Sequence, residues 1–247
     1  MQITERGERY TVIDDFLDDA ELAELRRVME HSKFSPALNS ATSVLTPEDG
    51  AAYRGRRTVV RSGASDQTAN GDPAAYGRIV RTITAEDAMF GTAQRDWNKL
   101  GFTFWNYPAG SRLGWHSDAG GGRQGSYILF LHDEWRASWG GETLVLDEDA
   151  THPRDGRDPK DVEAWVREAD RDLVAVLPRP NRLLLLQAGT PHQVNRVDPT
   201  AALVRRSLTG HVWKKAEESG AAARDSLRRF LGALEGAAGE RAPHGTS

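Results

Sequence analysis

Two histidines and one aspartate in this chain have the types and the spacing of a metal-ligand set. His116 and Asp118 stand two residues apart, and His192 follows 76 positions after His116. Side chains two residues apart on an extended strand share a face, so a His-x-Asp segment can direct both groups to one point. Two imidazoles and one carboxylate leave open positions on a non-heme Fe(II) ion. The residues therefore predict a metal centre for oxygen chemistry, with its third ligand on a strand distant in sequence.

A bare His-x-Asp triplet occurs often by chance, and its neighbours are more informative. The triplet follows a Tyr-Pro-x-Gly segment and precedes four further signals, which are the apolar run 126–131, Gly140-Gly141-Glu142, Pro191-His192-x-Val194 and Arg205-x-Ser207. This order resembles the 2-oxoglutarate/Fe(II)-dependent dioxygenases, in particular their prolyl-4-hydroxylase-like branch. The resemblance covers about residues 97–213.

The resemblance implies a reaction and the residues that support it. His116, Asp118 and His192 would hold Fe(II), and 2-oxoglutarate and O2 would be the co-substrates, with ascorbate as a supporting reductant. The enzyme would hydroxylate an unactivated C–H bond of an amino acid, a peptidyl residue or a natural-product intermediate, releasing succinate and CO2. Related halogenases have Gly or Ala at the carboxylate position, so Asp118 favours hydroxylation, desaturation or ring formation over halogenation.

The same resemblance assigns the binding of 2-oxoglutarate. Arg205 would pair with the distal carboxylate, because the planar guanidinium binds a carboxylate with two parallel hydrogen bonds. The family pattern Arg-x-Ser selects Arg205 with Ser207 over Arg206, and strand alternation puts Arg206 on the opposite face. Tyr107 matches a family tyrosine near the co-substrate, where a phenol can donate a hydrogen bond.

Three positions depart from the family pattern. The distal His and the Arg are 13 residues apart instead of about ten, which predicts a lengthened turn and leaves the choice between Arg205 and Arg206 open. Phe130 stands where some relatives have a tyrosine, and Ser126, on the same strand face, is a candidate to replace its hydrogen bond. His211 takes the place of a common tryptophan and is interpreted as structural.

The substrate site is only outlined by the sequence. Trp105 and Trp115 are candidate apolar walls, and Arg56 and Arg57, from an arginine-rich segment, are candidates to meet an acidic group. The segment 35–72 that contains these arginines is expected to form a lid or substrate wall, or else a solvated loop. Two other function classes stay open, namely a cupin-type metal oxygenase that needs no 2-oxoglutarate and a sensor or binding module on the same barrel.

Bulk composition narrows the class of protein further. A length of 247 residues suits one domain with appendages. The formal net charge of -4 gives no basic footprint for nucleic acid, and no apolar run reaches the roughly 18 residues of a membrane span. The chain contains no cysteine and no recognisable signal peptide, from which we expect a cytoplasmic location. The expected partners are small-molecule, amino-acid or peptide substrates; the oligomeric state is not predicted.

Short strands with turn signals and flanking helices predict a mainly β fold, a double-stranded β-helix of the jelly-roll or cupin-like type. We expect one domain over residues 1–215 with its core at 97–213. A strand at 11–17 precedes a helix that Asp18 caps, and 73–90 is expected to be helical. Further expected features are a solvated charged insert at 147–172 with a short helix at 159–169, a buried strand pair within 175–186, a C-terminal helix at 216–238 and a disordered tail at 239–247.

Overall fold

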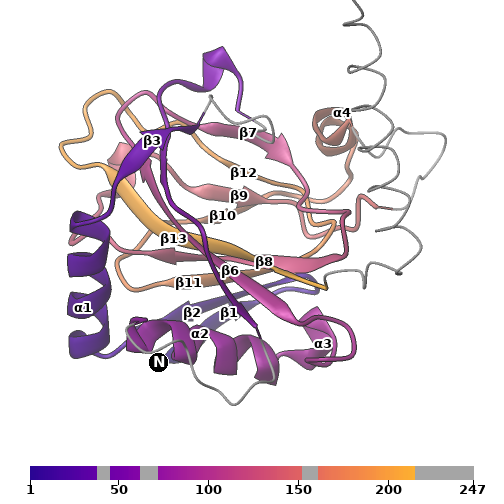
Figure 1. The fold of residues 1–247 in the computed structure, drawn as a ribbon. Coiled ribbons are helices and arrows are strands. Elements are labelled where there is room, and N and C mark those ends of the chain that lie inside the picture. Colours follow the sequence, from indigo (N-terminus) through magenta and orange to yellow (C-terminus); the bar gives the residue numbers. More distant parts are fainter. Residues whose placement is uncertain (38–44, 62–71, 152–160, 215–247) are drawn as a thin grey trace, which may run out of the picture. The chain divides into compact units, whose positions relative to one another are not determined.

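Two antiparallel sheets pack face to face in the computed structural model, which describes residues 1–37, 45–61, 72–151 and 161–214 (Figure 1). The larger sheet has the order β1 (Gln2–Arg6), β2 (Tyr10–Asp14), β11 (Leu183–Gln187), β8 (Arg123–Phe130), β13 (Arg205–Trp213), β6 (Lys99–Tyr107), β4 (Tyr53–Gly55), β3 (Phe34–Pro36), and β5 (Thr58–Arg61) also pairs with β6. The smaller sheet has the order β10 (Val174–Val176), β9 (Thr143–Val145), β12 (His192–Val194), β7 (Leu113–His116).

The strands from β6 to β13 form a jelly roll. Along the chain they pass back and forth between the two sheets, and in the smaller sheet β12 pairs with β9 and β7, which are distant from it in sequence. This confirms the predicted fold class. The strand pair expected within 175–186 is different in detail, because β10 and β11 lie in different sheets and do not pair. The proline-containing connection between them, residues 177–182, carries the chain from one sheet to the other.

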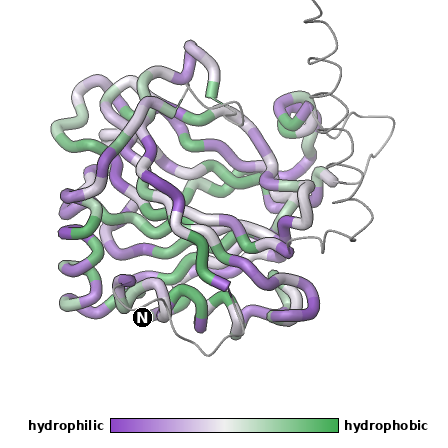
Figure 2. Tube along the Cα trace, viewed as in Figure 1, coloured by the Kyte–Doolittle hydropathy of each residue, from purple (hydrophilic) through white to green (hydrophobic). Residues whose placement is uncertain are grey.

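The alternation of side chains gives the larger sheet two distinct faces. One face carries residues such as Phe102, Leu129 and Leu208, which pack with helix side chains in the main core. The opposite face carries Ile128 and Leu184, which pack against the smaller sheet. Figure 2 shows the hydrophobic segments concentrated in the central strands. Both faces of the larger sheet are thus covered around β11 and β8. Toward β6, the face that carries Ile128 lines a cavity.

Three helices cover the outer face of the larger sheet. Helix α1 (Asp19–Glu30) begins with a capping box in which Asp18 accepts from the backbone N–H of Glu21 and the Glu21 carboxylate accepts in return, as predicted. Helices α2 (Ala74–Ala85) and α3 (Asp87–Phe90) confirm the helical prediction for 73–90. Buried side chains such as Leu25 and Ile79 join these helices to the sheet.

The segment 35–72 contributes strands rather than only a loop. Within its described part, β4 pairs with β6 through Tyr53↔Asn106 and Arg54↔Trp105, and β5 pairs with β6 from Thr58 onward. A short 3₁₀ turn, Pro47–Asp49, lies between β3 and β4, and a second one, Ala137–Trp139, lies outside this segment between β8 and β9. This part of the chain is therefore held on the edge of the sheet by backbone hydrogen bonds.

The charged insert is partly buried, which corrects the expectation that it is solvated. Helix α4 (Val162–Arg167) lies within the predicted helix, and its Trp165 side chain is buried against Leu146 and Ala150. Residues 152–160 of the insert, the predicted helix 216–238 and the predicted tail 239–247 lie outside the described residues. No helix in the described part of the chain is long and apolar enough to cross a membrane.

Candidate active site

The three predicted metal ligands come together at the cavity between the sheets. His116 ends β7 and His192 begins β12, and the two residues are register partners. Asp118 lies two residues beyond the end of β7, in a loop rather than on the strand as expected. One ligand atom from each residue lies within 4.8 Å of the others, and His192 Nε2 is 3.6 Å from Asp118 Oδ2. Two imidazoles and a carboxylate so arranged fit a divalent transition-metal ion.

Backbone carbonyls select the tautomer of both histidines. Nδ1 of His116 lies 2.8 Å from the carbonyl oxygen of Gly114, and Nδ1 of His192 lies 2.9 Å from that of Thr190. A carbonyl oxygen can only accept, so each Nδ1 carries the hydrogen and each Nε2 presents a lone pair. This arrangement of a ligating imidazole anchored through its other nitrogen is typical of metal sites.

Burial and neighbouring charges give His192 and Asp118 the protonation states that bind a metal ion. Burial, together with the nearby His116, lowers the pKa of His192 to about 4, so His192 is neutral at neutral pH. Burial raises the pKa of Asp118, but His211, His192 and His116 outweigh it and hold the pKa well below the usual value. The aspartate is therefore ionised and the buried histidine uncharged.

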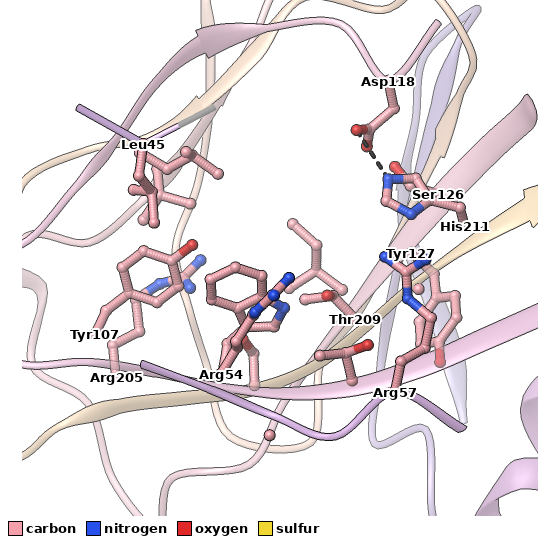
Figure 3. A pocket seen from close by; sticks show the side chains of 18 of the residues that line it. Leu45, Arg54, Arg57, Tyr107, Asp118, Ser126, Tyr127, Arg205, Thr209 and His211 are labelled. Atoms are coloured by element: carbon pink, nitrogen blue, oxygen red, sulfur yellow. Dashed lines mark hydrogen bonds and ion pairs between the residues drawn. The ribbon is translucent and has the colours of Figure 1, made fainter. Parts of the chain in front are cut away.

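His211 makes a contact that the sequence did not reveal. Its Nε2 lies 2.9 Å from Asp118 Oδ1, the contact dashed in Figure 3. His211 is on β13, on the face shared with Arg205 and Ser207. This contact fixes Oδ1 of Asp118, and the other carboxylate oxygen, Oδ2, faces His192. The replacement of the family tryptophan by a histidine was the available signal, but nothing in the sequence identified its partner.

Arg205 is a buried cation that donates to neutral groups of the described residues. Its side chain is 1% exposed, Nε donates to the Gly141 carbonyl at 2.8 Å, and Nη2 donates to Thr143 Oγ1 at 3.2 Å. Its guanidinium lies over the rings of Tyr107 and Phe130. Among the described residues no carboxylate lies within 4.0 Å of it. Burial lowers the pKa of Arg205 to about 10, so it stays charged. A buried unpaired charge is unfavourable, which indicates an anionic ligand.

The side chains around Arg205 have hydrogen-bonding capacity to spare. Ser207 is fully buried and its Oγ has no partner among the described residues. Tyr107 is the register partner of Arg205 and is also buried, which raises the pKa of its phenol and keeps it protonated. Arg206 points the other way, half exposed, with Nη1 4.0 Å from Glu30. The strand alternation that favoured Arg205 over Arg206 is therefore observed.

The Gly-Gly pair permits the close approach to Arg205. Gly141 has φ +72°, and a Cβ built on it would lie 3.0 Å from Arg205 Cδ. Gly140, with φ +63°, has the Arg196 carbonyl oxygen where a Cβ would stand. Positive φ and the lack of space both favour glycine. The close approach at this pair thus brings the Gly141 carbonyl to the Arg205 guanidinium.

The remaining predicted residues either line the cavity or lie outside its lining. The cavity has a volume of about 760 Å³, and its wall includes all three candidate ligands, Tyr107, Arg205 and Ser207. Trp105, Arg56, Arg57 and Ser126 also line it, whereas Trp115 does not, because it points away from the face of its neighbour His116. Ser126 is the register partner of His211, while Phe130 is that of Ser207, so Ser126 lies at the end of the cavity away from Arg205.

Residues 102–213 match a family described as the 2OG-Fe(II) oxygenase superfamily. No curated protein sequence matches the chain. Among solved structures, a prolyl-4-hydroxylase from Pseudomonas putida is similar at 18% identity with a TM-score of 0.56, over 83% of this chain and 92% of that one. A Trichoplax adhaerens prolyl hydroxylase, in complex with a hypoxia inducible factor peptide fragment, is similar at 17% identity with a TM-score of 0.50, over 84% of each chain. SnoN, a non-heme α-ketoglutarate-dependent epimerase from nogalamycin biosynthesis, is similar at 16% identity with a TM-score of 0.50, over 83% of this chain and 77% of that one.

The matched stretch includes the three candidate ligands and Arg205. The chain matches the 2OG-Fe(II) oxygenase superfamily over residues 102–213. It is an oxidoreductase of the dioxygenase class, with Fe(II), 2-oxoglutarate and O2 as its metal and co-substrates. This assignment decides against the two classes left open by the sequence, the 2-oxoglutarate-independent oxygenase and the sensor module.

Proposed function

We propose that the enzyme hydroxylates an unactivated C–H bond of an amino acid, a peptidyl residue or a natural-product intermediate while 2-oxoglutarate is converted to succinate and CO2. The observation that carries the proposal is one cavity that combines two features. It holds a ligand set of two histidines and a carboxylate, and it holds a buried guanidinium that has no carboxylate within 4.0 Å among the described residues.

His116, Asp118 and His192 would hold the iron, which, together with 2-oxoglutarate, supplies the oxidising chemistry when bound. The chain's own part is to orient and shield. The Nδ1 hydrogen bonds of the two histidines set the direction of their Nε2 lone pairs. The His211 contact sets the direction of the carboxylate. Three protein ligands leave further positions open for co-substrate and O2.

Arg205 would bind the distal carboxylate of 2-oxoglutarate, with Ser207 and Tyr107 as additional donors. A carboxylate at this place would neutralise the buried guanidinium and accept from the unpaired Ser207 hydroxyl. The protonated Tyr107 phenol can also donate there. Each interaction is stronger between these buried side chains than at the surface, because low polarity weakens competing hydration.

Retention of Asp118 favours hydroxylation over halogenation, since its carboxylate occupies the position that chloride needs in the related halogenases. The SnoN likeness indicates that the fold serves other outcomes too, so hydroxylation itself must be measured. Trp105 is the proposed apolar wall; Trp115 is left out because it does not line the cavity. A cytoplasmic location also stays a prediction, testable by cell fractionation.

Two measurements test the proposal. Proton NMR should show Fe(II)-dependent conversion of 2-oxoglutarate to succinate, slow without substrate and lost in Asp118→Ala. With candidate substrates under 18O2, mass spectrometry should show one labelled oxygen in the product. Succinate formation that persists without iron, or in Asp118→Ala, would refute the assignment, and a product that gains no oxygen would exclude hydroxylation.

A further inference from the structure

Five cationic side chains line the same cavity as the candidate iron ligands: Lys33, Arg54, Arg56, Arg57 and Arg123. Arg205 is a sixth cation, already assigned above to 2-oxoglutarate. The single acidic residue in the described lining is Asp118. This excess of positive charge lies in a chain whose formal net charge is -4. A basic cavity in an acidic protein is a local feature that composition does not explain.

The arginines at the cavity wall are carried by paired strands. Arg54 belongs to β4 and is the register partner of Trp105 on β6. Arg56 and Arg57 form the two-residue connection to β5, which pairs with β6 in turn. Figure 3 shows the Arg54 and Arg57 side chains rising from the sheet into the space that Asp118 and His211 border. Their backbone is therefore fixed relative to the proposed iron site.

Among the described residues, these cations lack the carboxylate partners that other arginines of this protein have. Arg112 lies 2.9 Å from Asp49, and Arg182 lies 2.6 Å from Asp14. Within the described residues no carboxylate lies within 4.0 Å of any of the five cavity cations. Burial lowers the pKa of Arg57, and the like charges of Arg123 and Arg54 lower it further. Like charges gathered without counter-ions repel one another, and the arrangement is relieved when an anion binds.

Iron and 2-oxoglutarate would not neutralise this cluster. The two charges of Fe(II) and that of Arg205 balance the two charges of 2-oxoglutarate and that of Asp118. Arg54 enters the cavity from a different strand than Arg205. It lies two strands from Ser207, through Trp105, a backbone separation of about 10 Å. The cavity of about 760 Å³ lies in the upper part of the range for ligand pockets, roughly 300–1,000 Å³, and a molecule as small as 2-oxoglutarate would leave space in it for a second ligand.

We propose that the substrate is anionic and that a carboxylate or phosphate group on it binds Arg54 and Arg57, with Arg56, Arg123 and Lys33 at the surrounding wall. The proposal rests on the proposed function, because it treats this cavity as the place of oxidation. Guanidinium groups suit both oxyanions through paired hydrogen bonds. A basic cleft also raises the local concentration of such a substrate before it binds.

The test is calorimetric titration of the protein loaded anaerobically with Fe(II) and 2-oxoglutarate. The probes are acetyl-diglutamate amide, its neutral diglutamine counterpart and acetyl-phosphoserine amide. Arg54→Gln and Arg57→Gln are compared with Arg61→Gln, a matched control that removes the same charge from an exposed β5 residue outside the cavity lining. We expect saturable binding of at least one anion, weakened about tenfold or more in each cavity variant and less than twofold in Arg61→Gln. The tighter anion identifies the group as carboxylate or phosphate.

Several results would overturn the inference. They are no binding of either anion, equal binding of the neutral dipeptide, equal loss in Arg61→Gln, or displacement of 2-oxoglutarate by the probe. The visible band of the iron and 2-oxoglutarate chelate is followed in the same sample. If the band forms and anions do not bind, the substrate inference fails alone. If the band never forms, the proposed function fails, and titration of the metal-free protein still decides whether the arginines bind anions.

Discussion

Replacing Arg205 by methionine should weaken 2-oxoglutarate binding severely while leaving the folding of the metal-free protein nearly unchanged. Methionine matches the aliphatic part of the arginine side chain and carries no charge, so this part of the site stays filled. Removing one partner of a buried, hydrogen-bonded charge pair costs roughly 2–5 kcal/mol, which corresponds to a roughly 30- to 5,000-fold higher Kd. The lost partner here is the one that the 2-oxoglutarate carboxylate would bind.

The small effect on folding follows from two opposing contributions. The pKa of Arg205 is lowered from 12.5 to about 10 in the folded state, so at every pH below about 10 the charged guanidinium opposes folding, by roughly 3 kcal/mol. Methionine removes this penalty. It also leaves the Gly141 carbonyl without its donor, which costs about 1–3 kcal/mol. The two nearly cancel, so Tm of the metal-free protein should change by less than about 5 °C.

The assay pairs anaerobic titration of the iron-loaded protein by 2-oxoglutarate with thermal unfolding of the metal-free protein. Arg206→Met is the matched control, since the neighbouring Arg206 is half exposed on the opposite face and should change Kd less than twofold. A normal Kd in Arg205→Met, or an equal loss in Arg206→Met, would refute the assignment of the distal carboxylate. A fall in Tm far beyond 5 °C would show that Arg205 serves mainly to stabilise the fold.

Three further variants test other contacts. His211→Phe removes the hydrogen bond to Asp118 and should lower Fe(II) affinity by roughly 10- to 100-fold, measured by competition with a chelating indicator; unchanged affinity would leave His211 only a wall residue. Gly141→Ala places a Cβ 3.0 Å from Arg205 at a positive φ and should raise the Kd of 2-oxoglutarate several-fold, and an unaffected Kd would contradict the close approach. Trp165→Ala should cost roughly 3–5 kcal/mol and lower Tm by roughly 6–20 °C; a fully solvated insert would tolerate it.

Strand alternation made much of the site predictable. It set Arg205 and Ser207 on one face and Arg206 on the other, and it aligned Trp105 with Tyr107. These are local consequences of the two-residue repeat and need no knowledge of the tertiary fold. The order of motifs supplied the rest, because it identified which distant histidine belongs with His116.

Contacts that depend on which strands become neighbours could not be predicted. Asp118 lies in the loop after β7 of the smaller sheet, whereas His211 lies on β13 of the larger sheet. Neither sequence position therefore indicates the contact between them. Ser126 shares a face with Phe130, as expected, but the register places it opposite His211 and far from Arg205. The burial of Trp165 was not predicted because the residues around it are mostly charged. The average composition of a segment does not show that one of its side chains is buried.

The central claim is that one cavity binds iron through His116, Asp118 and His192 and 2-oxoglutarate through Arg205. Anaerobic titration of the metal-free protein with Fe(II) and then 2-oxoglutarate tests it most directly, by the weak visible charge-transfer band of the chelate. We predict a band that saturates at one equivalent of each, is lost in His192→Ala and needs far more 2-oxoglutarate in Arg205→Ala. Tight Fe(II) binding without a band, or a band unchanged in both variants, would contradict the claim.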